Sequence, residues 1–299
     1  MKKYVSIDIG GTAIKYGIIG ESGEILVKQE MATEAQKGGP SILQKALDIV
    51  EGFQREYELE GVCISTAGMV DVEEGMIFYA GPLMPDYTGT KFKKTIEEKT
   101  GLPCEVENDV NCAGLAESVS GAAKGSRVTL CLTIGTGIGG CILIDGEVFH
   151  GYSGSACEVG HMLMDGDEFQ AFGATSVLCT KVAEMKRQPV QDWDGRRIFA
   201  EAQNGDAACI QAIDEMADTL GKGIANTCYV VNPQTVVLGG GIMAQEAYLK
   251  PRIQSAIEKY LMTDVAKHTE LKMAEHKNDA GMLGAFYHFR GRRQIQNAR

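Results

Sequence analysis

The chain has 299 residues, of which 44% are hydrophobic and 23% are charged, as expected of a globular protein with a substantial core. Lys and Arg total 29 against 40 Asp and Glu, which gives a net charge of −11. Nucleic acids and anionic membrane surfaces reward concentrated positive charge, so neither is an expected partner.

The chain carries no apolar run close to the roughly 18 residues of a membrane span, and Asp8 interrupts the first apolar segment too early for a secretory signal. Nine cysteines are scattered through apolar runs such as "GVCIS" and "TLCLT". That pattern is typical of buried, reduced thiols. We therefore expect a cytoplasmic protein without a membrane partner.

The first half of the chain is predicted to open with strands and to continue with alternating helices and strands. Apolar runs between tight turns indicate the strands, and Pro40 begins a helical pattern with one apolar face. The predicted strands span residues 4–9, 15–19, 24–30, 61–66 and 104–107, and the predicted helices begin at residue 40 and span residues 91–100 and 110–120.

The second half repeats this order. Asp145-Gly146 indicates a hairpin turn, and Asp206 is a good N-cap for a long amphipathic helix. The predicted strands span residues 128–134, 141–144, 147–150, 235–238 and 271–274, and the predicted helices span residues 206–231 and 245–261 and begin at residue 280. The pattern predicts an α/β protein of two related lobes, residues 1–117 and 118–299, in which the last helix packs back on the first lobe.

The first glycine-rich turn, "DIGGT", follows the first strand. Gly10 and Gly11 let main-chain N–H groups approach an anion, and Thr12 adds a hydroxyl donor. A carboxylate such as Asp8 would repel phosphate, so its presence beside a phosphate cradle indicates a divalent cation, Mg²⁺ held through water. The alternative is an ordinary glycine turn next to a capping Asp.

Two further glycine-rich turns lie in the second half. "TIGTGIGG" formally matches the dinucleotide fingerprint, but a strand follows it where the fingerprint needs a helix, so that interpretation is rejected. "VVLGGGIM" leaves a flat backbone surface that suits a nucleotide base or ribose. Three such turns at strand ends predict a phosphate clamp made from paired hairpins.

Two polar stretches are candidates for substrate binding. In "EVENDVNCAG", Asn108 and Asp109 lie where a strand meets a helix, the place where ligands bind in open α/β folds. Asp109 could accept a proton there, or it could merely cap the helix. In "ACEVGHM", Glu158 and His161 are three residues apart and suit sugar hydroxyls.

Together these stretches resemble the ROK family of bacterial sugar kinases and related sugar-responsive repressors. The resemblance covers nearly the whole chain and depends on segments in family order: "DIGGT", "STAGMVD", "ENDVNCAGLAE", "IGTGIGGCILIDGEVFHG", "EVGHM", "NPQTVVLGGG" and "AGMLGA". It implies two actin-like (ribonuclease-H-like) lobes around a central cleft for nucleotide and sugar. It also implies an ATP-dependent sugar kinase with ATP and Mg²⁺ as cofactors.

The resemblance assigns roles to three groups of residues. The two phosphate loops comprise Asp8, Gly10, Gly11, Thr12 and Lys15 in the first, and Gly135, Thr136, Gly137 and Gly140 in the second. The adenosine is flanked by Gly239, Gly240 and Gly241. The sugar site is lined by Gly68, Asn108, Asp109, Glu158 and His161, with Asp109 as the general base and Asp8 binding Mg²⁺ through water.

The chain departs from the family at a zinc element that many members carry after the Glu-x-Gly-His motif. Gln170, Phe172 and Val177 stand where three cysteines would be, and these side chains form no thiolate site. We therefore expect no structural zinc. Cys157 and Cys179 also differ from the family pattern near the sugar, which leaves glucose, N-acetylmannosamine and β-glucosides open, with N-acetylmannosamine favoured.

Other functions fit these residues less well. A repressor of this family would need a DNA-binding segment for which Asp8 leaves no room, and an actin-like ATPase would have no use for Asn108 and Asp109. We therefore expect transfer of the γ-phosphate of ATP to the 6-hydroxyl of a hexose or N-acetylhexosamine. The alternatives are a β-glucoside kinase or a catalytically weak sugar-sensing protein. A homodimer is expected from the resemblance and from Gly221 and Gly223, which permit close helix approach.

Overall fold

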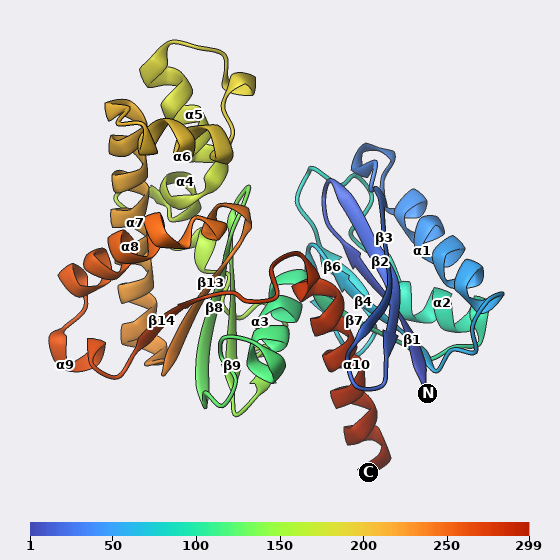
Figure 1. Cartoon of the computed structure of the whole chain (residues 1–299). Helices are drawn as coiled ribbons and strands as arrows, with labels where there is room; N and C mark the ends of the chain where they lie inside the picture. The colour runs from blue at the N-terminus through green and yellow to red at the C-terminus, as the bar shows by residue number, and fades with distance from the viewer. Residues whose placement is uncertain (299) are drawn as a thin grey trace. The chain divides into compact units, whose positions relative to one another are not determined.

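The computed structural model describes residues 1–298, with side chains up to residue 294 (Figure 1). The chain divides into two compact α/β units. Unit 1 comprises Met1–Val119, His150–Ala156 and the chain from Asn278 on, and unit 2 comprises Ser120–Phe149 and Cys157–Lys277. The first break thus follows Val119 rather than residue 117, and unit 1 includes a short internal segment and the last helix.

Unit 1 is built on a five-stranded sheet with the order β3-β2-β1-β4-β7. β1, β2 and β3 form antiparallel hairpins, and β4 and β7 are parallel to β1. The bounds are β1 (Lys3–Ile9), β2 (Ala13–Gly20), β3 (Ile25–Ala32), β4 (Gly61–Thr66) and β7 (Cys104–Asn108). Every one of them coincides with a predicted strand, so the α/β prediction is confirmed for this unit.

Different helices cover the two faces of this sheet. Successive strand residues face opposite sides, so Ile7 packs in the core beneath α1 and α2, whereas Tyr4 packs against α10. The remaining elements of the unit are α1 (Gly39–Gln54), α2 (Phe92–Thr100), α3 (Asp109–Ser120), α10 (Ala280–Ala298) and a small hairpin of β5 (Met69–Asp71) and β6 (Met76–Tyr79).

Unit 2 repeats the arrangement with the sheet β10-β9-β8-β13-β14. β8, β9 and β10 are antiparallel, and β13 and β14 are parallel to β8. The bounds are β8 (Val128–Ile134), β9 (Ile138–Ile144), β10 (Glu147–Val148), β13 (Thr235–Gly239) and β14 (Glu270–Met273). β10 ends before His150, contrary to prediction, because the chain there leaves the sheet and joins unit 1.

The helices of unit 2 enclose one large apolar core with the sheet. Its α7 starts as predicted, because the Asp206 side chain accepts a hydrogen bond from the N–H of Cys209 at 3.0 Å. The elements are α4 (Gln170–Gly173), α5 (Thr175–Lys186), α6 (Gly195–Gln203), α7 (Ala207–Val231), α8 (Glu246–Tyr260), α9 (Thr263–Ala266) and the hairpin of β11 (Leu163–Met164) and β12 (Asp167–Glu168).

Gly221 and Gly223 pack inside unit 2. A Cβ added at Gly221 would lie 2.3 Å from the Cβ of Ala256 on α8, and one added at Gly223 would lie 2.4 Å from the ring of Phe169. The close helix approach that these glycines permit is therefore an internal one, and they give no support to a homodimer.

All nine cysteines are free thiols, and seven of them are buried. Burial raises the pKa of Cys63, Cys104 and Cys112, which keeps these thiols protonated and unreactive. Within the described residues, no helix combines the length and the apolar character that crossing a membrane requires.

Candidate active site

The first glycine-rich turn joins β1 to β2. The Gly10 N–H donates to the carbonyl of Ala13 at 3.0 Å, and the Thr33 hydroxyl donates to the carbonyl of Gly10 at 2.6 Å. Gly11 and Thr12 are exposed, and a Cβ added at Gly11 would meet no atom within 4 Å. Backbone contacts thus fix a turn whose tip is open to a ligand.

Asp8 lies on β1 just before this turn and is paired across the hairpin with Lys15. The Ser65 hydroxyl of β4 donates to Asp8 Oδ1 at 2.7 Å. Burial raises the pKa of Asp8, and Ser65 and Lys15 offset part of this increase. Gly281 on α10 also lies close to Asp8, since a Cβ added at Gly281 would lie 2.3 Å from the Asp8 carboxyl carbon.

Gly68, Asn108 and Asp109 come together at the end of β7. The Asn108 side-chain amide donates to the Gly68 carbonyl at 2.9 Å and to Asp109 Oδ1 at 3.1 Å. Gly68 has a φ of +95°, and a Cβ there would lie 2.9 Å from the carbonyl of Tyr79, so only glycine brings its carbonyl to this place without strain.

Asn108, rather than Asp109, is the main cap of α3. Its Oδ1 accepts the N–H groups of Val110 and Asn111 at 2.9 and 3.1 Å, while Asp109 Oδ1 accepts the N–H of Val110 at 2.9 Å. Asp109 is the first residue of the helix. Capping of α3 is therefore a weaker explanation for Asp109, because Asn108 already caps this helix.

The two glycine-rich turns of unit 2 lie side by side, because β13 runs parallel to β8 with Gly239 opposite Thr133. The Gly135 N–H donates to the carbonyl of Gly137 at 2.9 Å and closes the first turn. Gly240, in the second turn, has a φ of +109°, and a Cβ there would lie 2.1 Å from the carbonyl oxygen of Ile134. The close contact between the turns thus requires glycine.

A cavity of about 460 Å³ opens between these turns. Its walls come from both turns and from α5, α6 and η4 (Gly241–Ala244). The lining residues are Ile134, Gly135, Thr136, Thr175, Ser176, Cys179, Asp194, Gly195, Arg196, Phe199, Gly241, Ile242 and Gln245. Most of these residues were not predicted, since α5 and α6 carry no motif. Cys179, which differs from the family pattern, lines this cavity.

Glu158 precedes the 3-10 turn η2 (Val159–His161) in unit 2, and His161 is its last residue. Burial raises the pKa of Glu158, and His161 offsets part of the increase. His161 Nδ1 lies 3.0 Å from Glu168 Oε1, and the Gln170 amide donates to Glu168 Oε2 at 2.7 Å. A carboxylate thus orients the imidazole, and Gln170 stands here at the first of the substituted cysteine positions.

Gly137 and Gly140 permit close approach of the first turn of unit 2 and β9 to Gln170 and Cys157. A Cβ at Gly137 would lie 2.6 Å from Gln170 Oε1, and one at Gly140 would lie 2.5 Å from the Cys157 carbonyl oxygen.

Within the part of the chain that the structure describes, no group of three or more His, Cys, Asp or Glu side chains could hold a metal ion.

Comparison with known proteins identifies close counterparts. A family model described as "ROK family" matches residues 4–292. A glucokinase of Halalkalibacterium halodurans is 32% identical over 94% of this chain and 93% of its own length. A beta-glucoside kinase of Listeria monocytogenes is 31% identical over 96% of this chain and 97% of its own length.

Solved structures agree over the whole fold. A proposed N-acetylmannosamine kinase from Listeria monocytogenes has a TM-score of 0.87 and 32% identity, and the match covers 97% of this chain and 99% of that one. A ROK glucokinase from Streptomyces griseus, solved with glucose and AMPPNP, has a TM-score of 0.83 and 26% identity, with 95% and 97% coverage. The two-unit α/β fold is the one these sugar kinases share.

Proposed function

This chain belongs to the ROK family, and on that premise we propose that it transfers the γ-phosphate of ATP to the 6-hydroxyl of a hexose or N-acetylhexosamine. The chain is a carbohydrate kinase, the class of its named relatives. The observation that carries the proposal is the arrangement at the end of β7. There Asn108 caps the helix, contacts the Gly68 carbonyl and donates to Asp109, which fixes the Asp109 carboxylate at the start of α3.

Asp109 is proposed as the general base. Phosphoryl transfer depends mainly on positioning and on neutralising charge, with one residue that orients the attacking hydroxyl and accepts its proton. The Asn108 amide donates to Asp109 Oδ1 at 3.1 Å, and this contact fixes the carboxylate. A carboxylate with an ordinary pKa suffices, because proton transfer can follow bond formation to phosphorus.

The nucleotide is proposed to lie in the cavity of unit 2. Glycine turns expose main-chain N–H groups to phosphate, and Gly135, Thr136 and Gly241 contribute to the cavity wall. We propose that the turn containing Gly10 and Gly11 in unit 1 also binds phosphate. The AMPPNP bound by the Streptomyces griseus glucokinase supports ATP as the donor.

Asp8 fits the role of a Mg²⁺ residue. It is a carboxylate beside a glycine turn, oriented by Ser65 at 2.7 Å, and a hard oxygen donor of this kind suits Mg²⁺ bound through water. When bound, Mg²⁺ neutralises phosphate charge. Asp8 itself is placed by Ser65 and Gly281, so its position is set before any ligand binds.

Glu158 and His161 are proposed to bind the sugar. Glu168 at His161 Nδ1 leaves Nε2 as the imidazole atom for a substrate hydroxyl. N-Acetylmannosamine and glucose are the proposed substrates, with N-acetylmannosamine first, as the Listeria monocytogenes structure suggests. A β-glucoside is the second candidate, because the identity to a beta-glucoside kinase is close to that with a glucokinase.

The substrate is tested by ADP release with glucose, N-acetylmannosamine, N-acetylglucosamine, mannose, fructose and a β-glucoside. We expect one of them to raise ADP release far above the rate without sugar. A β-glucoside that outperforms both free sugars would select the alternative. Equal ADP release with and without every sugar would contradict kinase activity and favour a sugar-sensing protein.

Gly240→Ala tests the nucleotide site. The substitution puts a side chain at a φ of +109° and 2.1 Å from the Ile134 carbonyl oxygen, and strain of this kind costs about 1–3 kcal/mol. We expect the two turns to separate and the KM for ATP to rise about tenfold, with a smaller change in the KM for sugar. Gly52→Ala, in α1 with no atom within 4 Å of its Cβ, is the control; an unchanged KM for ATP in Gly240→Ala would contradict this site.

Homodimer assembly stays a prediction. Sedimentation of the purified chain measures it directly: a species of twice the 32.2 kDa chain mass is expected.

A further inference from the structure

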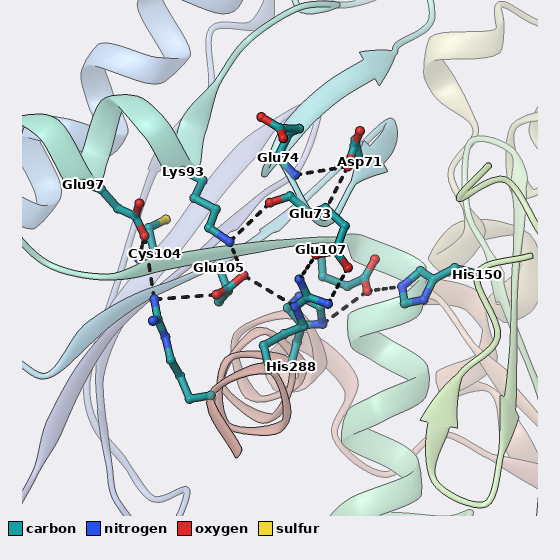
Figure 2. Close-up of polar contacts among 12 residues, drawn as sticks. Asp71, Glu73, Glu74, Lys93, Glu97, Cys104, Glu105, Glu107, His150 and His288 are labelled. Atoms are coloured by element: carbon teal, nitrogen blue, oxygen red, sulfur yellow. Dashed lines mark hydrogen bonds and ion pairs between the residues drawn. The ribbon is translucent and has the colours of Figure 1, made fainter. Parts of the chain in front are cut away.

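A buried cluster of charged side chains lies beside the proposed base. Glu105 and Glu107 of β7 are fully buried on the face that meets α10. His288, Arg292 and Arg293 of α10 approach this pair. Figure 2 shows Glu105, Glu107 and His288 among the polar contacts of the cluster. Two carboxylates are costly to bury and are retained only with partners, so the cluster has a specific arrangement to maintain.

Glu107 is the member of the cluster that touches the proposed base's neighbours. Its Oε1 accepts the N–H of Asn108 at 2.8 Å and the side-chain amide of Asn111 at 3.0 Å. These two residues flank Asp109 and Val110 at the start of α3. One carboxylate oxygen therefore binds the backbone just before the residue that is proposed to deprotonate the sugar and a side chain two residues after it.

The other oxygen of Glu107 binds two histidines. Figure 2 shows Glu107 between His150 and His288; His150 Nε2 lies 2.6 Å and His288 Nδ1 3.3 Å from Glu107 Oε2. His288 is buried, and its Nε2 has no hydrogen-bond partner. A neutral His288 that donates from Nδ1 explains this arrangement, because its Nε2 then carries only a lone pair.

His150 begins the segment His150–Ala156, which unit 1 includes although the flanking residues Phe149 and Cys157 belong to unit 2. The segment also packs on unit 1 at Gly154, where a Cβ would lie 3.0 Å from the Val70 carbonyl oxygen. Two residues after its end comes Glu158, a proposed sugar ligand. The chain that leads to Glu158 is thus anchored by Glu107.

We propose that Glu107 is a positioning residue and that, with protonated His150, it forms a clamp that holds the start of α3 and the segment 150–156 in place for catalysis. The proposal rests on the proposed function for its effect on turnover. The clamp itself, the ion pair between Glu107 and His150 at 2.6 Å, is independent of the substrate.

The charges around the clamp favour the ion pair. Burial opposes the ionisation of Glu107, but the hydrogen bond from His150, the charge of His150 and the hydrogen bond from Asn111 lower its pKa overall. Burial likewise lowers the pKa of His150, but Glu107 more than offsets this and raises it, with Arg292 opposing and Glu73 assisting. Burial lowers the pKa of His288, and Cys112 of α3, whose own pKa burial raises, stays neutral.

The direction of the pH dependence follows. Because the pKa of His150 is raised in the folded protein, the clamp is fully formed below the ordinary histidine value of about 6.5 and weakens as pH rises through the raised value. Neutral His150 can still donate a hydrogen bond to the Glu107 carboxylate, but the attraction between opposite charges is lost. We therefore expect kcat to fall on the alkaline side through loss of the clamp.

Glu105 provides a matched control. It lies on the same strand and the same face as Glu107 and is equally buried, and Lys93 binds it at 2.9 Å. Glu105 forms ion pairs with Lys93, Arg292 and Arg293, so Glu105→Gln removes a buried carboxylate charge and leaves the ion pair between Glu107 and His150 in place. If Glu107 contributed only a buried charge to β7, Glu107→Gln and Glu105→Gln would have similar kcat values and pH profiles.

The test compares Glu107→Gln, His150→Gln and Glu105→Gln in the full chain, with kcat and KM recorded between about pH 6 and about pH 9, a range that brackets histidine titration. Glu107→Gln and His150→Gln are expected to lower kcat about tenfold at the acid end, leave the KM for ATP within about twofold, and lose the alkaline fall. Glu105→Gln is expected to keep the wild-type kcat profile. His150 is partly exposed, so its variant is expected to fold even if a variant at the buried β7 position does not.

Hydrogen exchange of residues 150–156 in the ligand-free protein separates this proposal from the kinase assignment. The clamp predicts lower protection factors in Glu107→Gln and His150→Gln than in the wild type and in Glu105→Gln. This difference would support the clamp even if no sugar were phosphorylated. Absence of sugar phosphorylation would contradict the kinase proposal but not the clamp. Equal protection in all four proteins, or an alkaline fall that Glu105→Gln also removes, would overturn the clamp.

Discussion

Asp109→Asn is expected to lower kcat about 1,000-fold, within the range that general bases contribute. The Val110 N–H donates to Asp109 Oδ1 at 2.9 Å. An amide is isosteric with a carboxylate, so the oxygen of the Asn side chain can still accept this hydrogen bond. The substitution therefore removes the proton acceptor and leaves the start of α3 intact. Steady-state ADP release with the best sugar gives kcat, and titration with AMPPNP gives the affinity for the nucleotide, which is expected to change less than about threefold.

Asp145→Asn is the control for this prediction. Asp145 lies in the exposed turn between β9 and β10 and pairs with Arg127 at 3.0 Å. The same chemical change there is expected to leave kcat unaltered. If Asp109→Asn retained more than about a tenth of the wild-type kcat, Asp109 would not be the base, and its helix position would need another explanation.

Gly284→Ala is expected to have the largest effect on stability. Gly284 lies on α10 where the helix crosses α3, and a Cβ there would lie 1.8 Å from the Cys112 carbonyl oxygen and 2.3 Å from its carbon. Both contacts are with backbone, so no side chain can rotate away. Overpacking of this kind typically costs about 1–3 kcal/mol, and denaturant unfolding followed by circular dichroism measures the loss.

Gly291→Ala, on the same helix, is expected to act in the opposite direction. No atom lies within 4 Å of its added Cβ, and alanine exceeds glycine in helix propensity by up to about 1 kcal/mol. The pair thus compares one substitution in one helix at two sites. Equal changes in the free energy of unfolding would show that α10 does not pack on α3 as described.

Gly284→Ala also links stability to catalysis. Because Cys112 belongs to the same helix as Asp109, a shift of α3 away from α10 displaces the proposed base. A displacement of about 1 Å can cost about 100-fold in rate. We therefore expect kcat to fall in the variant at temperatures where it is still folded.

The sequence was sufficient for the elements with strong local signals. Hairpin strands separated by turn residues, and a long helix capped by Asp206, appear at their predicted places. The glycine turns were recognisable because strand ends and consecutive glycines are local features. Asn108 and Asp109 were recognisable because they lie where a strand meets a helix, although which of them caps the helix depends on a side-chain rotamer that the sequence does not encode locally.

The rest depends on contacts between distant segments. Glu107, His150 and His288 are far apart in the sequence. Glu107 and His150 lie in stretches that carry the family resemblance, but no role was predicted for either residue, and only the fold brings them together with His288. The same holds for α5 and α6, whose residues complete the cavity of unit 2. Gly221 and Gly223 were interpreted as a possible contact with a second chain, but they pack against Ala256 and Phe169 of the same chain. The sequence cannot distinguish these two cases, because small residues on a helix permit close approach of any neighbour.

The central claim is that the γ-phosphate moves to a sugar hydroxyl and not to water, and ³¹P NMR of the reaction mixture measures this directly. With the sugar that gives the greatest ADP release, the account predicts one new phosphomonoester signal, coupled to the protons of a CH₂ group and equal in amount to ADP. A signal of inorganic phosphate alone, or of an ester on another carbon, would contradict it.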